Sequence, residues 1–168
     1  MKCPDCGYDN VVGLSVCECC GQDLTAFDET DAYRDELKAV LLSDLDDAGL
    51  IDPVCATVDV SIAEVLERMR AKYRGSVLIL ENEKLIGIFT ERDLIKRLPA
   101  TAVLENERVG DYMTPDPDTY QLDDSLCLAV NGMAVRGNRH LPVMDGERLV
   151  GLLGVRKILA YIAEKADL

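Results

Sequence analysis

Apolar residues recur at helical spacing in two segments of this chain. Ile62, Val65, Leu66 and Met69 occupy positions i, i+3, i+4 and i+7 in the stretch that begins at Ser61. The later segment repeats the pattern in Ser125, Leu126, Ala129, Val130 and Met133. Both segments are predicted to be helices that bury one stripe.

Two short apolar runs separated by a polar turn follow each predicted helix. Residues 76–80 and 85–89 flank a turn at residues 81–84, and the later pair turns at Asp145-Gly146. Such pairs predict β-hairpins. A short helix is predicted after each hairpin from the apolar positions Leu94, Ile95, Leu98, Ile158, Leu159 and Ile162. The predicted unit is strand, helix, strand, strand, helix.

The two units are copies of one another. Residues 53–98 align with residues 117–162 without a gap, at a constant offset of 64. An internal duplication therefore sets the fold. We expect an α/β (α+β) fold in which residues 50–100 and 117–165 form two repeats, joined by residues 101–116 and packed with pseudo-twofold symmetry.

Two further segments precede the repeats. Residues 1–24 contain too few apolar side chains for a core, so a metal must hold them together if they fold. Residues 25–49 predict a linker helix from Asp28 to Gly49 that docks onto the repeats. Its apolar positions are Leu37, Val40, Leu41 and Leu45.

Charge and composition exclude several classes of function. The 168 residues carry a net charge of −13, which should repel nucleic acid and anionic membranes. No apolar run approaches the roughly 18 residues of a membrane helix, and no apolar signal region follows Met1. Five of the seven cysteines fall within the first 20 residues, which indicates a reducing compartment. We expect a cytoplasmic protein without membrane contact.

Two Cys-x-x-Cys-Gly knuckles form the strongest metal signal. The predicted ligands are Cys3, Cys6, Cys17 and Cys20. Thiolates from two tight turns can meet tetrahedrally at about 2.3 Å from a structural Zn²⁺, and the segment resembles a short prokaryotic zinc ribbon. Gly21 follows Cys20 in the same way that Gly7 follows Cys6, so Cys20 is assigned as the ligand and Cys19 as its neighbour. Cys19 could still exchange with Cys20. A rubredoxin-type iron site and a redox-active dithiol are the alternatives. Cys55 and Cys127 are predicted to be buried.

The repeats resemble the tandem cystathionine-β-synthase (CBS) domain pair, or Bateman module, over residues 50–165. The markers in register are Ser61/Ser125, Met69/Met133, Gly87/Gly151, Leu141-Pro142-Val143 and Asp111-Tyr112-Met113-Thr114-Pro115. The resemblance implies a non-enzymatic regulatory module that senses AMP, ADP, ATP or S-adenosylmethionine between its repeats. It also implies a homodimer formed through the helices and an unknown effector protein.

The end of the first hairpin carries the candidate ligand chemistry. Gly87, followed by Ile88, would let a ligand approach the backbone, while the Thr90 hydroxyl and the Asp93 carboxylate could bond phosphate or ribose oxygens. In the alternative interpretation, Thr90 and Asp93 only cap the following helix.

The second copy is chemically different. Gly154 and Lys157 replace the hydroxyl and the carboxylate, so we expect one principal site. By analogy with the family, Arg139 and His140 lie where phosphate contacts arise, although a lone histidine is often just a partly exposed residue at a strand start.

Three functions remain. The first is an adenine-nucleotide sensor with a structural zinc ribbon that mediates protein contacts, and the second is an adaptor with a vestigial cleft. The third, nucleic-acid binding through the ribbon, is disfavoured because Lys2 is the only basic residue before Arg34. No catalytic constellation is evident, so we do not expect an enzyme.

Overall fold

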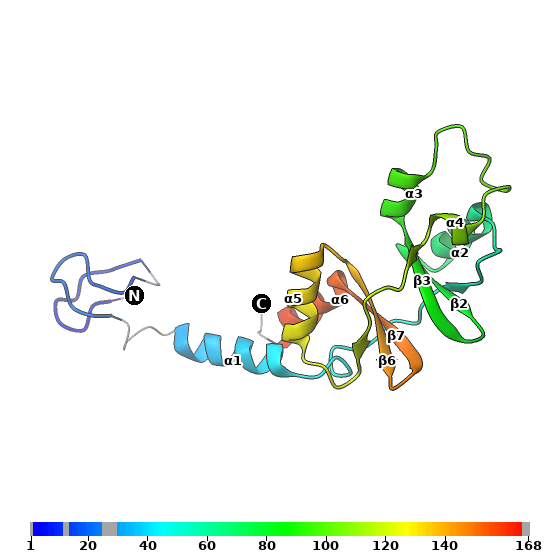
Figure 1. Cartoon of the computed structure of the whole chain (residues 1–168). Coiled ribbons are helices and arrows are strands. Elements are labelled where there is room, and N and C mark those ends of the chain that lie inside the picture. The colour runs from blue at the N-terminus through cyan, green and yellow to red at the C-terminus, as the bar shows by residue number, and fades with distance from the viewer. Residues whose placement is uncertain (1, 12–13, 25–29, 166–168) are drawn as a thin grey trace. The chain divides into compact units, whose positions relative to one another are not determined.

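The computed structural model describes residues 2–11, 14–24 and 30–165 (Figure 1). The chain separates into two compact units, and both repeats lie in the unit Leu42–Tyr161 except for the end of the second repeat, from Ile162 on. Helix α1 (Thr30–Leu42) precedes the repeats. Within the described residues, no helix is both long and apolar enough to cross a membrane.

The first repeat follows the predicted order of elements. These are β1 (Cys55–Ala56), α2 (Ile62–Ala71), β2 (Ser76–Glu81), β3 (Lys84–Thr90) and α3 (Glu91–Arg97). β1 runs parallel to β2, and β2 and β3 form the predicted antiparallel hairpin. Its turn residues Asn82 and Glu83 both have positive φ, 48° and 65°, which is the backbone that a two-residue hairpin loop of type I′ requires.

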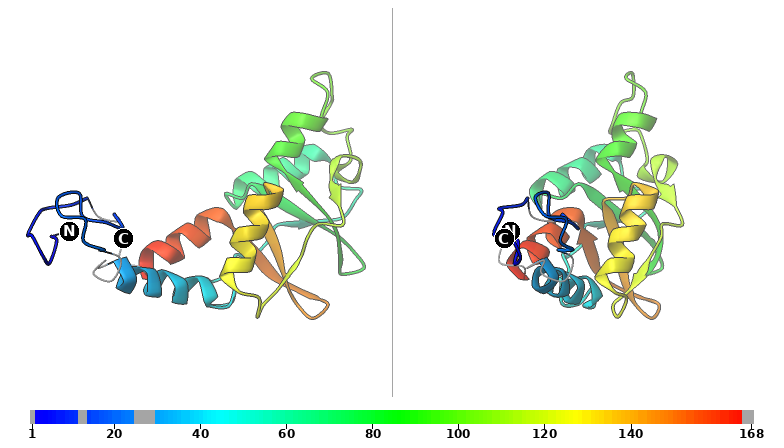
Figure 2. Two further views of the ribbon diagram at one scale, coloured as in Figure 1. Left: turned by 60° about the vertical axis from the view of Figure 1, so that its left-hand side comes forward. Right: turned by 90° about the vertical axis from the view of Figure 1, so that its left-hand side faces the viewer.

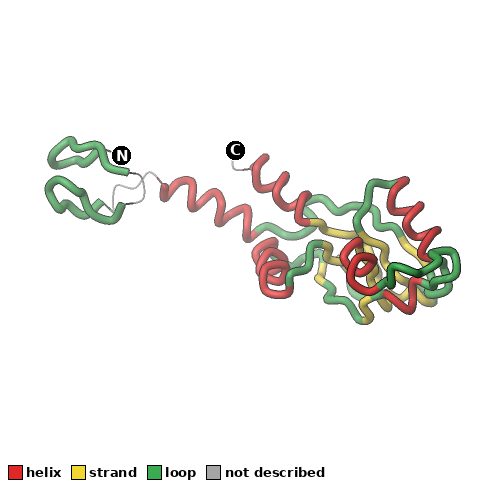
Figure 3. Tube along the Cα trace, turned by 90° about the horizontal axis from the view of Figure 1, so that it is seen from above, coloured by secondary structure: helices red, strands yellow, loops and turns green. Residues whose placement is uncertain are grey.

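The second repeat has the same order. Its elements are β5 (Tyr120–Gln121), α5 (Leu126–Arg136), β6 (His140–Asp145), β7 (Arg148–Gly154) and α6 (Val155–Lys165). The strand order is β5-β6-β7, with β5 parallel to β6 and β6 antiparallel to β7. The duplicated strand-helix-strand-strand-helix unit and the α/β class are confirmed. Figure 2 displays the β2–β3 and β6–β7 hairpins of the two repeats side by side, and Figure 3 places their strands between helices.

The first sheet buries both of its faces. Val77, Ile79 and Phe89 pack with the apolar stripe of α2 in the core of the first repeat. The alternate residues Leu78 and Ile88 point to the other face, where they contact Leu152 of β7. Because side chains alternate across a strand, the hairpin serves both its own core and the interface between the repeats.

The repeats also exchange short strands. The segment between them forms α4 (Val109–Tyr112) and β4 (Thr114–Pro115), and β4 pairs with β3 of the first repeat, Thr114 opposite Ile88. Reciprocally, Ile51 pairs with Leu152 of the second repeat through bonds of 2.9 and 3.0 Å. Each repeat therefore completes the sheet of the other.

The exchanged pairings reveal one inserted residue. Ile51 pairs with Leu152, and Thr114 pairs with the equivalent residue of the first repeat, Ile88. Ile51 and Thr114 are therefore equivalent and lie 63 positions apart, whereas aligned residues from position 53 onward lie 64 positions apart. The second copy accommodates the extra residue at Asp116, whose φ of 46° lies in the left-handed region.

The linker helix is shorter than predicted. Its predicted start at Asp28 lies outside the described residues, and α1 ends at Leu42 instead of Gly49. After Leu42 the backbone bonds to the lead-in of α5, with Leu45 N donating to Asp124 O and Leu126 N to Ser43 O. Because Leu45 is fully buried there, packing against the second repeat outweighs continuation of the helix.

Candidate functional site

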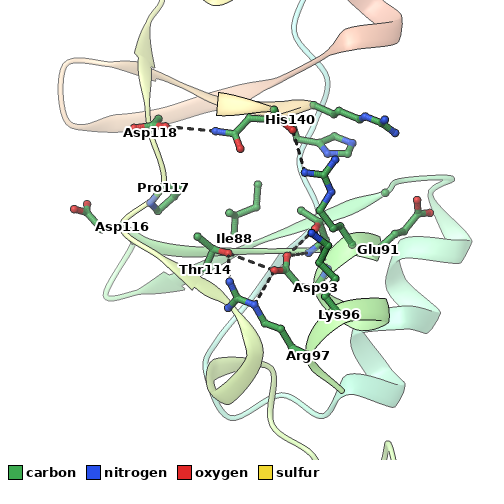
Figure 4. A pocket seen from close by; sticks show the side chains of 16 residues that line it. Ile88, Glu91, Asp93, Lys96, Arg97, Thr114, Asp116, Pro117, Asp118 and His140 are labelled. Atoms are coloured by element: carbon green, nitrogen blue, oxygen red, sulfur yellow. Dashed lines mark hydrogen bonds and ion pairs between the residues drawn. The ribbon is translucent and has the colours of Figure 1, made fainter. Parts of the chain in front are cut away.

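A pocket of about 380 Å³ lies between the two repeats (Figure 4). Five of the six predicted ligand-binding residues line it: Ile88, Thr90, Asp93, Arg139 and His140. The first three come from β3 and the start of α3, and the other two are the first residue of β6, His140, and the residue before it. Strand ends of both repeats thus form one site.

Gly87 lies outside the pocket lining. A side chain at this position would overlap the sulfur of Met113, which precedes β4. Gly87 therefore lets the exchanged segment approach β3, whereas the sequence suggested that it would let a ligand approach.

Thr90 and Asp93 form the capping box of α3. Asp93 Oδ2 accepts from Thr90 N at 2.9 Å and from Thr90 Oγ1 at 2.6 Å, and Asp93 N donates to Thr90 Oγ1 at 3.3 Å. These bonds satisfy amide groups that the first helical turn leaves without partners. The alternative capping role is therefore real, and the same two residues also line the pocket.

The second oxygen of Asp93 faces the exchanged segment. Asp93 Oδ1 lies 3.2 Å from Arg97 Nε and accepts a long bond of 3.4 Å from Thr114 Oγ1. Arg97 also donates to the carbonyl oxygens of Tyr112 and Met113, at 3.2 and 2.7 Å. Asp93 is only 8% exposed, and partners on both carboxylate oxygens hold it at the pocket wall.

Charged residues of α3 and of the segment before β5 also line the pocket. They are Glu91, Arg92, Lys96, Arg97, Asp116 and Asp118. Arg92 reaches across to the second repeat, where its Nη1 donates to Gly137 O at 3.3 Å. Asp118 pairs with Arg136. None of these residues was predicted from the sequence as a site residue. The spacing of Arg92 and Lys96, four positions apart in a helix that starts after Thr90, places both on one helix face.

His140 is the titratable group that the pocket perturbs. Burial lowers its pKa below the usual 6.5, Glu91 acts in the opposite direction, and Arg139 and Arg156 lower the pKa further. The imidazole lies directly over Gly75, whose ideal Cβ would be 3.3 Å from Cε1 of the ring. The ring is therefore neutral near pH 7 in the unliganded protein.

The cysteine cluster forms a second candidate site, within the first 24 residues. The Sγ atoms of Cys3, Cys6, Cys17 and Cys20 all lie within 4.8 Å of one another. Gly7 and Gly21 follow the two knuckles with φ of 72° and 76°, and their amides donate to Cys3 O and Cys17 O at 2.9 Å. Glycine is needed here because the left-handed turn disfavours other residues.

The sulfur geometry fits a tetrathiolate metal. Cys3 and Cys20 are 3.6 Å apart and Cys6 and Cys17 are 3.7 Å apart at Sγ, close to the ~3.8 Å edge of a tetrahedron with metal–sulfur bonds of about 2.3 Å. The buried Asn10 donates to Cys17 Sγ at 3.5 Å and accepts from Glu18 N at 3.0 Å. The donor set and its outer contacts suit zinc or iron.

The thiol environments within this cluster differ. Burial opposes ionisation of Cys17, but amide groups of Cys20, Cys19 and Asn10 outweigh it and bring the pKa of Cys17 to about 6. The backbone contact with Tyr8 is the largest single influence on Cys6 and lowers the pKa of its thiol. Burial and the neighbouring cysteines together outweigh this contact, so the pKa of Cys6 is raised.

The remaining cysteines only partly match expectation. Cys19 is exposed and lies outside the four-cysteine cluster. Cys55 is half-buried, and desolvation raises its pKa. Cys127, predicted to be buried, is exposed, so that prediction is wrong. It follows Leu126 on α5, and the apolar stripe turns Leu126 and Ala129 inward while Cys127 faces solvent.

Comparison with known proteins identifies the family. The sequence profile described as "CBS domain" matches residues 46–100 and 109–164, more than half of the chain. The chain belongs to the CBS domain family. The two repeats are therefore CBS domains, and the pocket lies between the members of a CBS pair.

Solved CBS structures share this fold. Protein MJ1225 of Methanocaldococcus jannaschii is 36% identical over 93 residues, covering 55% of this chain and 33% of that protein. Its crystal structure matches with a TM-score of 0.67 and 24% identity, over 81% of this chain and 54% of that chain. The chain spans 61%, 50% and 33% of the length of three curated relatives.

Two further CBS structures contain ligands. PAE2072 from Pyrobaculum aerophilum, solved in complex with AMP, matches with a TM-score of 0.63 and 20% identity, over 72% of this chain and 98% of that chain. The CBS pair of MJ0100, in complex with 5′-methylthioadenosine and S-adenosyl-L-methionine, matches with a TM-score of 0.64 and 23% identity. The match covers 74% of this chain and 98% of that chain. At these identities the likeness establishes the fold.

The second CBS domain lacks the polar groups of the first at the matching positions. Gly154 stands where Thr90 stands, and its nearest side-chain neighbour is Ile51, 3.9 Å from an ideal Cβ. The Lys157 side chain lies against Gly49, with its Cε 3.1 Å from the ideal Cβ there. Tyr161 takes the place of Arg97 and pairs with Ser43 at 3.2 Å. The duplicated fold therefore carries asymmetric chemistry.

Proposed function

We propose that this CBS pair is a non-catalytic sensor that binds one adenine nucleotide in the pocket between its repeats. One observation carries the proposal: the carboxylate and hydroxyl of Asp93 and Thr90 line the same pocket as the cationic side chains of Arg139 and Lys96. A nucleotide needs both kinds of group, acceptors for its ribose hydroxyls and donors for its phosphate.

The bonding of Asp93 suggests how the ribose is held. Oδ2 already accepts two bonds from Thr90, whereas Oδ1 lies 3.2 Å from Arg97 Nε and accepts a long bond of 3.4 Å from Thr114. A carboxylate offers about four acceptor positions. A ribose hydroxyl would therefore donate to Oδ1 in place of Thr114, and Ile88 would offer apolar contact to the base.

The cations around Arg139 form the phosphate end of the proposed site. Arg92 and Lys96 lie one helical turn apart on α3, and Arg139 approaches from the second repeat. The volume of about 380 Å³ falls within the usual range of small-molecule pockets, about 300 to 1,000 Å³. The AMP complex of PAE2072 and the adenosyl ligands of MJ0100 support this ligand class.

The four-cysteine cluster would hold a structural zinc. Four thiolates leave no open coordination position, so the metal would stabilise residues 1–24 and would not act on a substrate. Carboxylates surround this ribbon at Asp5, Asp9, Glu18 and Asp23, so it would mediate protein contacts and not contacts with nucleic acid.

Homodimerisation through the helices is part of the proposal. Ile95 on α3 and Leu159 on α6 occupy matching positions of the two repeats and are 81% and 61% exposed, and Val135 on α5 is 75% exposed. Exposed apolar side chains on helices suit a helix-to-helix interface. An unidentified effector would receive the signal, and the free thiols suit a reducing cytoplasm.

Calorimetry with AMP, ATP and S-adenosylmethionine tests the sensor. A sensor gives saturable heat with at least one ligand at one site per chain. An adaptor with a vestigial cleft gives no heat with any of the three, and salt-sensitive retardation of nucleic acid in a gel would favour the ribbon as the binding element.

A further inference from the structure

His140 is the only histidine of the chain and lines the pocket. Its backbone pairs with Gly154, and its ring lies over Gly75. The carboxylate of Glu91 reaches the same place, since its Oε2 would be 3.4 Å from an ideal Cβ of Gly75. In Figure 4, His140 extends from the second repeat toward the side where Glu91 begins α3.

The charges that act on this ring come from α3, from the residue before β6 and from α6. Glu91 at the start of α3 favours the imidazolium, whereas Arg139 beside the ring and Arg156 on α6 oppose it. Protonation of His140 in the unliganded pocket would add a third positive charge to two arginines and would cost desolvation. The neutral ring is therefore the stable form.

A bound phosphate changes this balance. A phosphate monoester carries nearly two negative charges at pH 7, and the cations of the pocket would draw it toward Arg139. Its charge would offset both arginines, and its oxygens could accept a hydrogen bond from a protonated ring. The cost of protonating His140 would then fall.

We propose that binding of a phosphorylated nucleotide promotes protonation of His140 from solvent, so that the CBS pair responds jointly to nucleotide and pH. The inference rests on the proposed nucleotide site and adds a regulation to it. Arg139 and His140 would act as a unit, one permanently charged and the other charged only in the complex.

The direction of the pH effect follows from linkage. The pKa of free His140 lies below 6.5, and the bound phosphate raises it. Affinity is therefore highest below the pKa of free His140 and falls as the pH rises from that pKa through the pKa of the complex. Below about pH 6 the phosphate itself takes up a proton, so the useful window runs from about 6 to 8.

The lone histidine makes the experiment direct. Proton NMR of the full chain should contain one imidazole Cε1–H signal, whose titration is followed with AMP, with adenosine and without ligand. We expect AMP to raise the midpoint by about one unit, which corresponds to about tenfold weaker binding at the alkaline end of the window. Adenosine, without phosphate, should not move the midpoint.

Calorimetry in buffers of low and high ionisation enthalpy measures the proton directly. AMP binding at pH 7 should take up a fraction of a proton per site, and His140→Gln should abolish this uptake while keeping a polar side chain. The thermal melting temperature of His140→Gln shows whether the variant is folded. We expect His140→Gln to be folded and to take up no proton when AMP binds.

The outcomes separate this inference from the proposed function. Absence of both AMP and ATP binding at every pH would contradict the nucleotide site itself. Saturable AMP binding with an unmoved imidazole midpoint and no buffer-dependent heat would overturn the proton linkage alone. Equal proton uptake in wild type and His140→Gln would assign the proton to another group and would also overturn it.

Discussion

Thr90 Oγ1 donates to Asp93 Oδ2 at 2.6 Å, and this bond joins the start of α3 to the wall of the ligand pocket. The pair that caps the helix is also the pair that the proposed ribose site requires. Ligand binding and helix stability are therefore coupled at one carboxylate, and a test of either must separate the two.

Replacement of Asp93 by alanine should weaken both. Loss of the capping box is expected to lower the free energy of unfolding by about 1 kcal/mol. Loss of the charged acceptor should weaken AMP binding tenfold or more, because a hydrogen bond with a charged partner contributes about 1.5 to 3 kcal/mol. Chemical denaturation and calorimetry measure the two effects.

Ser61→Ala is the matched control. Ser61 Oγ accepts from Glu64 N at 3.3 Å as the cap of α2, and Ser61 does not line the pocket. It should lose comparable stability and keep its AMP affinity. If Ser61→Ala and Asp93→Ala lost affinity equally, the carboxylate would have no direct role in binding.

Arg139→Ala should discriminate among ligands. Arg139 lines the pocket from the second repeat, so its removal should weaken AMP binding about tenfold and leave adenosine binding nearly unchanged. Arg148, on the same hairpin, has a 75% exposed side chain and pairs with Asp145, so Arg148→Ala should bind both ligands normally. An equal loss of AMP and adenosine affinity would argue against a phosphate contact.

Local sequence patterns predicted the repeated elements, because the apolar run of residues 76–80 and the helical spacing in residues 62–69 each reflect burial of the segment itself. The strand exchange was not predictable in this way. Thr114 pairs with Ile88, and Ile51 pairs with Leu152, residues that are 26 and 101 positions apart. Pairings of one or two residues are too short to show a periodicity, so the sequence does not indicate which strand each segment joins.

The role of Gly87 was misjudged for a related reason. Glycine in a terminal strand motif indicates close approach of another group, but the sequence does not identify that group. The structure places Met113 there, a residue from the exchanged segment. In contrast, Cys3, Cys6, Cys17 and Cys20 were correctly predicted to gather in one cluster, because ligand spacing within tight turns is a local property.

The adjacent cysteines 19 and 20 allow a controlled test of the metal site. Cys20→Ser should lose tight binding of one zinc per chain, because only Cys20 belongs to the four-sulfur cluster. Cys19→Ser should retain the metal, since Cys19 is exposed outside that cluster. Elemental analysis of protein purified without added metal measures the content and identifies zinc or iron.

Chelation extends this test to stability. Removal of the metal should unfold residues 1–24, because their small buried cluster consists of Cys3, Cys17 and Leu24. The CBS pair has its own core, so its thermal transition and AMP affinity should persist. Retention of metal by Cys20→Ser together with its loss in Cys19→Ser would reverse the assignment of the fourth ligand.

Two glycines of β7 test the strand exchange. A Cβ at Gly151 would lie 2.6 Å from Cβ of Leu50, an atom fixed to the backbone, so Gly151→Ala must displace the segment that pairs with Leu152. Such overpacking typically costs about 1 to 3 kcal/mol. Gly154→Ala meets no atom closer than 3.9 Å and should be neutral or slightly stabilising, because alanine orders a strand at lower entropic cost. Urea denaturation of both variants gives the difference in unfolding free energy. Equal stability of the two would mean that Leu50 can leave β7 freely, and the reciprocal completion of the two sheets would then contribute little to the fold.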